Sequence, residues 1–218
     1  MRRNKEYVRQ LEDFLIKDYS PGIINCEPRT ERELLSIYQT HTVPLYEYIC
    51  YMYSFSFPIS NEIRAMLGHL SEYRSSEIIK REELHNVYGH FRRANLDTLK
   101  IICDELDRSL LIILQKQYPY DYRNMYESYL KEYCEMYYTA KNAYLKAQEK
   151  ECVGSDRNTH NIFEFYYSAA KQYILLKQFY EKYKKGTQRI KWITTIKKSV
   201  CWCCSVFGIV VAILQLFI

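Results

Sequence analysis

Apolar side chains recur every three or four positions along most of this 218-residue chain, which is the spacing of one face of an α-helix. The longest such run is expected to form a helix from just after Ser76 to about Gln117. Its apolar positions are Leu96, Leu99, Cys103, Leu106, Leu110 and Ile113. Apolar and polar residues rarely alternate as they do in strands, and all five prolines lie at or before Pro119. The pattern therefore predicts an all-α protein, built as a helical bundle.

Shorter helices are expected before this long one. A first helix should cover about residues 3–18, where a Ser-Pro-Gly stop signal follows. Thr30 followed by Glu33 is a capping-box pattern, so a second helix should begin there, and Pro44 should kink or break it. The serine at position 60 is expected to cap a short helix over about 61–74.

Two tyrosine-rich helices are expected after Pro119, over about 121–150 and 159–185. The apolar seam predicted for the first is Tyr122, Tyr126, Tyr129, Tyr133, Met136, Ala140, Ala143 and Ala147. That of the second is Ile162, Tyr166, Ala169, Tyr173, Leu176, Tyr180 and Tyr183. Matched seams joined by a short loop predict an antiparallel hairpin, in which the tyrosine rings pack between helices and the hydroxyls reach the rim.

Residues 199–218 contain no charged residue, histidine or proline. As a helix they would extend about 30 Å, the thickness of the hydrocarbon core of a bilayer, so we expect a transmembrane helix. The flanking residues expected at the membrane are Trp192, Lys197, Lys198 and Trp202, and the helix carries the small residues Gly208 and Ala212 four positions apart. A basic flank predicts that the preceding domain faces the cytoplasm, and small residues favour helix association in lipid.

The charge and cysteine content of the chain are consistent with a cytoplasmic domain joined to a membrane helix. Seven cations at 182–198, before the apolar stretch, exceed the formal net charge of +5, so the remainder of the chain is near neutral and the basic character does not indicate a nucleic-acid-binding face. Three of the eight cysteines lie in the apolar stretch, and the other five are scattered without a Cys-x-x-Cys pair. We expect these five to be reduced, buried thiols.

Arg64 and His69 show the pattern of an Arg, four residues and a His. It resembles the motif of HEPN proteins, small all-helical domains of bacterial toxins and antiviral defence. The resemblance implies that two copies meet in a dimer, where Arg64 would hold the scissile phosphate of RNA and His69 would assist attack by the ribose 2′-hydroxyl. Residues five apart point about 140° apart on a regular helix, so a break near Gly68 or a second subunit would be required. In the structural alternative, Arg64 pairs with a carboxylate and His69 caps a packing contact.

The segment 89–97, together with residues 61–64 and 69–70, also resembles helical modules of bacterial phage-defence systems. The residues expected to form a binding surface or switch are His90, Arg92, Arg93 and Asp97. Arg93 and Asp97 are four apart, as are Asp104 and Arg108, so each pair is expected to interact on one helical face.

No cofactor is expected, because the chain lacks a Gly-rich phosphate loop, a nucleophile elbow and a paired-carboxylate motif. A metal site is not expected either, since His85 and His90 are five apart without a second pair of ligands nearby.

The favoured hypothesis is an antiviral effector of the inner membrane. A cytoplasmic helical domain at 1–185, with a HEPN-like core at about 58–118, would be joined by a basic segment at 186–198 to the helix at 199–218. The domain would sense a defence-system protein or nucleic-acid component, form a homo-oligomer and disrupt the lipid bilayer. The alternatives are a membrane-tethered ribonuclease acting on RNA and a non-toxic, tail-anchored adaptor.

Overall fold

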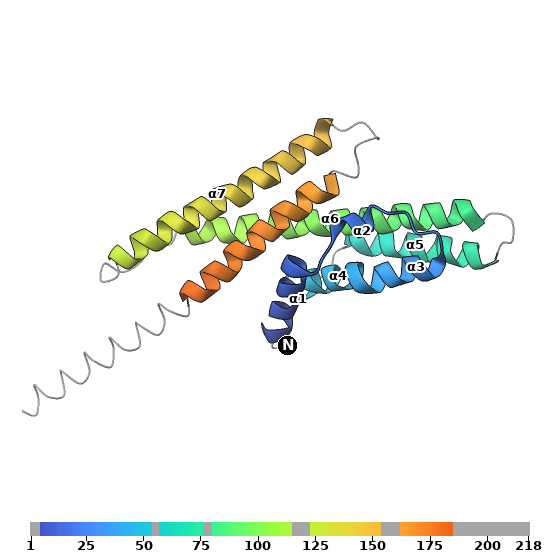
Figure 1. Cartoon of the computed structure of the whole chain (residues 1–218), viewed down its shortest axis with the longest axis horizontal. Coiled ribbons are helices and arrows are strands. Elements are labelled where there is room, and N and C mark those ends of the chain that lie inside the picture. Colours follow the sequence, from blue (N-terminus) through green and yellow to red (C-terminus); the bar gives the residue numbers. More distant parts are fainter. Residues whose placement is uncertain (1–4, 54–56, 76–79, 115–122, 154–161, 185–218) are drawn as a thin grey trace, which may run out of the picture. The chain divides into compact units, whose positions relative to one another are not determined.

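The computed structural model describes residues 5–53, 57–75, 80–114, 123–153 and 162–184, and nearly all of these residues are helical (Figure 1). In order the helices are α1 (Lys5–Lys17), α2 (Pro21–Ile24), α3 (Glu31–Ile37), the π-helical η1 (Tyr38–Thr42), α4 (Val43–Met52), α5 (Phe57–Ser75), α6 (Lys80–Leu114), α7 (Arg123–Val153) and a helix over 162–184. These residues include no strand, so the all-α prediction is confirmed. The chain divides into two units, residues 1–177 and 178–218, and the second is described only over 178–184.

A search of the described helices for a membrane span found none with the length and apolar character required. The transmembrane helix expected at 199–218 lies outside the described residues, as does the basic segment before it.

The capping box predicted at α3 is present. Thr30 Oγ1 accepts a hydrogen bond from the Glu33 backbone N–H at 3.2 Å, while the Glu33 carboxylate turns back to accept from the Arg29 N–H at 2.8 Å. The first bond satisfies a backbone donor of the first helical turn, and the second, which a regular capping box directs at the N-cap N–H, reaches one residue further back.

Pro44 lies in the first turn of α4, directly after η1. Because proline lacks an N–H and crowds the carbonyl four residues earlier, the preceding turn widens into π-helix. The predicted break is therefore a change of helical pitch between α3 and α4.

The prediction that Ser60 caps a helix at Asn61 was wrong. α5 begins at Phe57, with Pro58 in its first turn, where a fixed φ and a missing N–H are both tolerated. Ser60 lies inside the helix, with its Oγ 3.3 Å from the Tyr46 hydroxyl. α5 then runs without interruption to Ser75, so the break considered near Gly68 does not occur.

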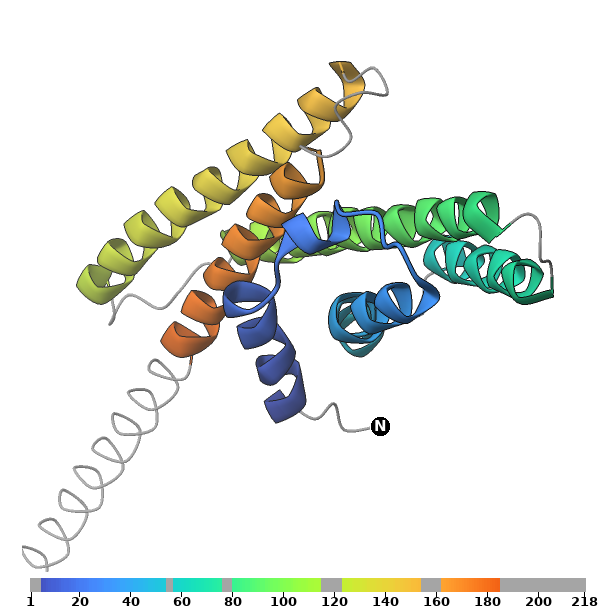
Figure 2. The same cartoon turned by 45° about the vertical axis from the view of Figure 1, so that its right-hand side comes forward.

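α5 packs closely against α6, and Figures 1 and 2 show α5 beside the first half of the longer helix. The side chains of α5 and of that part of α6 that are buried in the core are Ile59, Met66, Leu70, Leu84, Val87, Tyr88, Phe91 and Ala94.

Helix 162–184 packs against α7, and the contacts advance along one helix as they go back along the other. Glu151, late in α7, accepts a hydrogen bond from Tyr166, whereas the ring of the earlier residue Tyr144 contacts that of the later residue Tyr173. That order is the one antiparallel neighbours produce.

The seam of α7 differs from the prediction by one position at two places. Tyr137 and Tyr144 are buried, whereas Met136 and Ala143 are only partly covered. The tyrosine hydroxyls reach carboxylates of α6, Asp107 and Asp104, and these hydrogen bonds favour the tyrosines at the interface.

Of the five scattered cysteines, Cys103 alone is buried, and burial raises the pKa of its thiol well above the ordinary value. Cys26, Cys50 and Cys152 are exposed, so the expectation of buried thiols was wrong for them. A small side chain at the protein surface is tolerated without any packing role.

Candidate functional site: a reciprocal histidine and glutamate cluster

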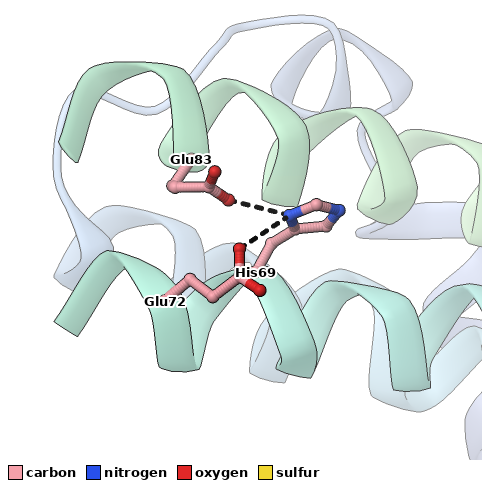
Figure 3. Close-up of side chains that lie close together, drawn as sticks. All are labelled: His69, Glu72 and Glu83. Atoms are coloured by element: carbon pink, nitrogen blue, oxygen red, sulfur yellow. Dashed lines mark hydrogen bonds and ion pairs between the residues drawn. The ribbon is translucent and has the colours of Figure 1, made fainter. Parts of the chain in front are cut away.

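Two histidines and two glutamates meet between α5 and α6. His69 of α5 lies with Nδ1 2.7 Å from the Glu83 carboxylate of α6, and His90 of α6 lies with Nδ1 2.7 Å from the Glu62 carboxylate of α5. The two imidazole rings stack between these pairs, with centroids 5.2 Å apart and planes at 20°. Figure 3 shows the His69 half, in which the imidazole faces Glu83 on the neighbouring helix. We refer to Glu62, His69, Glu83 and His90 as the reciprocal cluster.

The cluster arises from a short pattern that occurs twice. Glu62 is followed by five residues and Gly68-His69, and Glu83 is followed by five residues and Gly89-His90. Residues seven apart lie on the same face of a helix, separated by about 10.5 Å along its axis. Because α5 and α6 run in opposite directions, the Glu of each copy meets the His of the other. Both histidines were predicted site residues whereas the two glutamates were not, and this repeated pattern is the signal in the sequence that identifies the glutamates.

The two halves of the cluster differ in the residue three positions after each histidine. Arg93 follows His90, and its Nε donates to the Glu62 carboxylate at 3.0 Å, while Nη2 lies 2.8 Å from His90 Nδ1. Burial alone would raise the pKa of Glu62, but the hydrogen bonds from His90 and Arg93 outweigh it and lower the pKa. In the other half the equivalent residue is Glu72, whose carboxylate is 4.0 Å from His69 Nδ1.

Arg64 and His69, the predicted catalytic pair, are not brought together within one chain. Arg64 is exposed and donates to the Asn61 amide oxygen at 3.2 Å, so its partner is an amide rather than the carboxylate considered from the sequence. His69 is directed at Glu83 instead. Since α5 continues through Gly68, the two side chains keep the angular separation of a regular helix, and only a second chain could complete such a site.

Arg93 and Asp97 do not form the expected pair. Arg93 turns to Glu62, and the cation nearest Asp97 is Lys100, at 3.9 Å. Burial raises the pKa of Asp97 above its ordinary value, and Lys100 offsets part of that rise. The carboxylate of Glu62 on the neighbouring helix is better placed for Arg93 than that of Asp97 on its own helix.

The second expected pair is absent as well. Asp104 accepts from the Tyr144 hydroxyl, and Arg108 lies 3.6 Å from Glu105. Arg92, also predicted as a site residue, places its guanidinium over the Tyr88 ring at 5.7 Å from the centroid. It therefore has a packing and cation–π contact rather than a place in the reciprocal cluster.

The residues predicted at the membrane all lie outside the described part of the chain. They are Trp192, Lys197, Lys198, Trp202, Gly208 and Ala212.

No family model, no curated protein and no solved structure matches this chain. The resemblance to HEPN proteins therefore stays a prediction from the motif.

Proposed function

We propose that this protein is a membrane-anchored antiviral effector whose helical domain receives a signal and whose clustered membrane helices disrupt the inner membrane. The observation that carries the proposal is the uncharged, apolar sequence of residues 199–218 behind a strongly basic flank. The helical domain is held at the cytoplasmic surface, and its trigger is a defence-system protein or nucleic-acid component.

Oligomerisation is required because each chain contributes one membrane helix. One helix cannot enclose a pore, whereas several copies can. Gly208 and Ala212 lie one helical turn apart and allow close approach of helices in lipid. Such an effector acts without covalent chemistry, which is consistent with a domain in which Arg64 and His69 face different partners.

A tethered ribonuclease remains the competing proposal, and it requires two chains. Arg64 is exposed on α5 and available to a second copy, and His69, whose Nδ1 is held by Glu83, would act on RNA through Nε2. The third proposal, a non-toxic adaptor, uses the anchor only for placement.

The test is expression of the full chain in bacteria, with growth, membrane potential and RNA integrity followed together. The effector proposal predicts growth arrest with depolarisation. Both should vanish on deletion of residues 199–218 and persist in the Arg64→Ala, His69→Ala double variant. RNA loss that requires Arg64 and His69 and survives the deletion would instead establish the ribonuclease, and absence of toxicity under phage challenge would leave the adaptor.

A matched pair of anchor variants separates oligomerisation from insertion. Gly208→Leu with Ala212→Leu keeps the apolar character of the helix but removes its small surface, so depolarisation should be lost while the protein stays in the membrane fraction. Ile209→Leu with Ile213→Leu changes adjacent positions without altering the small residues and should leave toxicity intact. Equal toxicity of the two pairs would contradict the proposed oligomer.

A further inference from the structure

The two halves of the reciprocal cluster differ in charge: one contains an arginine beside its glutamate, and the other contains a second glutamate in place of the arginine. In the half with the arginine, the Glu62 carboxylate is bound by the Arg93 guanidinium as well as by His90. In the other half, Glu83 faces His69, and the position equivalent to Arg93 holds a second carboxylate, that of Glu72. No Lys or Arg among the described side chains lies within ion-pair distance of Glu72 or Glu83.

This missing charge matters because Glu83 is largely covered. Its side chain is 13% exposed between α5 and α6, where a carboxylate is stabilised by a fixed cation or by several donors. The imidazole of His69 reaches Glu83 through one nitrogen only, and the positive end of the α6 dipole supplies only a partial charge. A cation bound between the two carboxylates and the imidazole would therefore stabilise this half of the cluster.

The donor atoms are close enough to share one ion. His69 Nδ1 is 2.7 Å from the Glu83 carboxylate and 4.0 Å from that of Glu72, and one donor atom from each residue lies within 4.8 Å of the others. Ligands of a tetrahedral zinc ion are about 3.3 Å apart, given bonds of about 2.0–2.2 Å. Small rotations of the Glu72 and Glu83 side chains would bring the set to that spacing, and both carboxylates already point toward the imidazole (Figure 3).

We propose that His69, Glu72 and Glu83 bind one divalent transition-metal ion of the zinc class, with a fourth position open to solvent. An imidazole ligand favours zinc and its neighbours over magnesium or calcium, which prefer oxygen ligands throughout. The ion takes the electrostatic place that Arg93 occupies in the other half and links α5 to α6. This site is independent of the membrane proposal, because it lies wholly in the helical domain.

The experiment titrates Zn²⁺ and Co²⁺ into the full chain in detergent after removal of metal by a chelator. Calorimetry should give one zinc site per chain. Co²⁺ should give visible absorption of a tetrahedral nitrogen and oxygen site without a thiolate charge-transfer band. Zinc should also raise the melting temperature, because it binds the folded helix pair.

Three variants test the ligands. Loss of even an outer-shell partner lowers metal affinity by about 10–100-fold, so Glu72→Gln and Glu83→Gln should each lower zinc affinity at least tenfold. Glu72→Arg copies the Arg93 half onto this one. Because Glu72 is exposed, that variant should remain folded, lose zinc binding and no longer gain thermal stability from the metal.

The matched control is His85→Ala. His85 also lies 2.9 Å from a glutamate, Glu27, but the pair is exposed and has no third ligand among the residues that the structure describes, so zinc affinity should be unchanged. Wild-type affinity in Glu72→Gln and Glu83→Gln would overturn the proposal. So would failure of the wild-type chain to bind zinc, or a Co²⁺ spectrum with thiolate bands alone.

Discussion

Tyr137 and Tyr173 donate hydrogen bonds to the same carboxylate oxygen, Oδ1 of Asp107, at 2.9 and 2.8 Å. The first tyrosine belongs to α7 and the second to helix 162–184, while Asp107 belongs to α6. Lys141 of α7 binds the other oxygen at 2.6 Å. One carboxylate therefore joins three consecutive helices, and two tyrosines at this interface are held by a hydrogen bond as well as by ring packing.

Replacing either tyrosine by phenylalanine should destabilise the fold, because a hydrogen bond to a charged acceptor is lost while the ring still packs. Each of Tyr137→Phe and Tyr173→Phe is expected to lower the free energy of unfolding by about 1.5 kcal/mol. The double variant should lose more unfolding free energy than the two single variants lose together, since the remaining donor partly satisfies the shared oxygen in each single variant. Chemical denaturation of the four proteins in a double-mutant cycle measures this.

Tyr138→Phe is the control for that cycle. Tyr138 follows Tyr137 directly but is 60% exposed, so its variant should unfold like the wild type. Strictly additive losses for Tyr137 and Tyr173 would show that the two hydroxyls do not share an acceptor.

Asp107→Asn should make the protein less stable at neutral pH and less sensitive to acid. Burial would raise the pKa of Asp107, but hydrogen bonds from Lys141, Tyr173 and Tyr137 outweigh it and hold the pKa below the ordinary value of 3.8. A lowered folded pKa contributes stability that is present above pH 3.8 and is lost as the pH falls through the lower folded value. The variant should lose about 3 kcal/mol at pH 7, and its difference from wild type should shrink below pH 3.8. Urea denaturation across that range measures the difference.

Asp97→Asn should change the stability at neutral pH in the opposite direction, by raising the free energy of unfolding. Burial raises the folded pKa of Asp97 above 3.8, so the ionised side chain disfavours the folded state at pH 7, and that penalty disappears as the pH falls through the raised value. Because the side chain is 37% exposed, solvent screens the effect, and the variant should gain only about a few tenths of a kcal/mol at pH 7. Loss of stability at neutral pH in Asp97→Asn would show that its contact with Lys100 outweighs desolvation.

Local signals in the sequence predicted most of the helices. The Thr30 and Glu33 cap and the three-four spacing of apolar residues act within one helix, so they can be recognised without knowledge of the fold. The start of α5 was placed too late because Ser60 looks like a cap, although Pro58 begins the helix earlier.

The candidate site was harder to predict, because its pairs cross between helices. Glu62 with His90, and Glu83 with His69, become neighbours only when α5 and α6 pack antiparallel. The expected pair of Arg93 and Asp97 relied on spacing within one helix, and the contact of Arg93 with Glu62 across the interface replaced it. Hydrophobic periodicity identifies the buried face of a helix but does not identify the residue opposite.

Acid should also destabilise the protein through His41. This side chain is 8% exposed, with its ring near Phe14 and Tyr19, and burial lowers its pKa below the ordinary value of 6.5. The unfolded chain binds a proton more readily, so the associated stability is present above pH 6.5 and is lost as the pH falls from there toward the lower folded value. His41→Leu should remove this slope below pH 6.5, measured by denaturation at each pH.

The control for His41 is His85→Gln, which changes an exposed histidine and should keep the wild-type slope in that range. A slope that persists in His41→Leu would assign the acid sensitivity to other groups.

Gly68→Ala and Gly89→Ala should each stabilise the protein. Both glycines lie inside continuous helices, and neither has a positive φ. A Cβ at Gly68 would meet nothing within 4 Å, and one at Gly89 would meet only the Arg93 Nη1 atom at 3.9 Å, an ordinary contact. Since alanine loses less backbone entropy than glycine on folding, each variant should gain about 0.5–1 kcal/mol in the free energy of unfolding. Ala65→Gly on the same helix is the reverse control and should lose a similar amount. A loss of stability in Gly68→Ala would mean that α5 bends at this glycine, which is the geometry that a single-chain pairing of Arg64 with His69 requires.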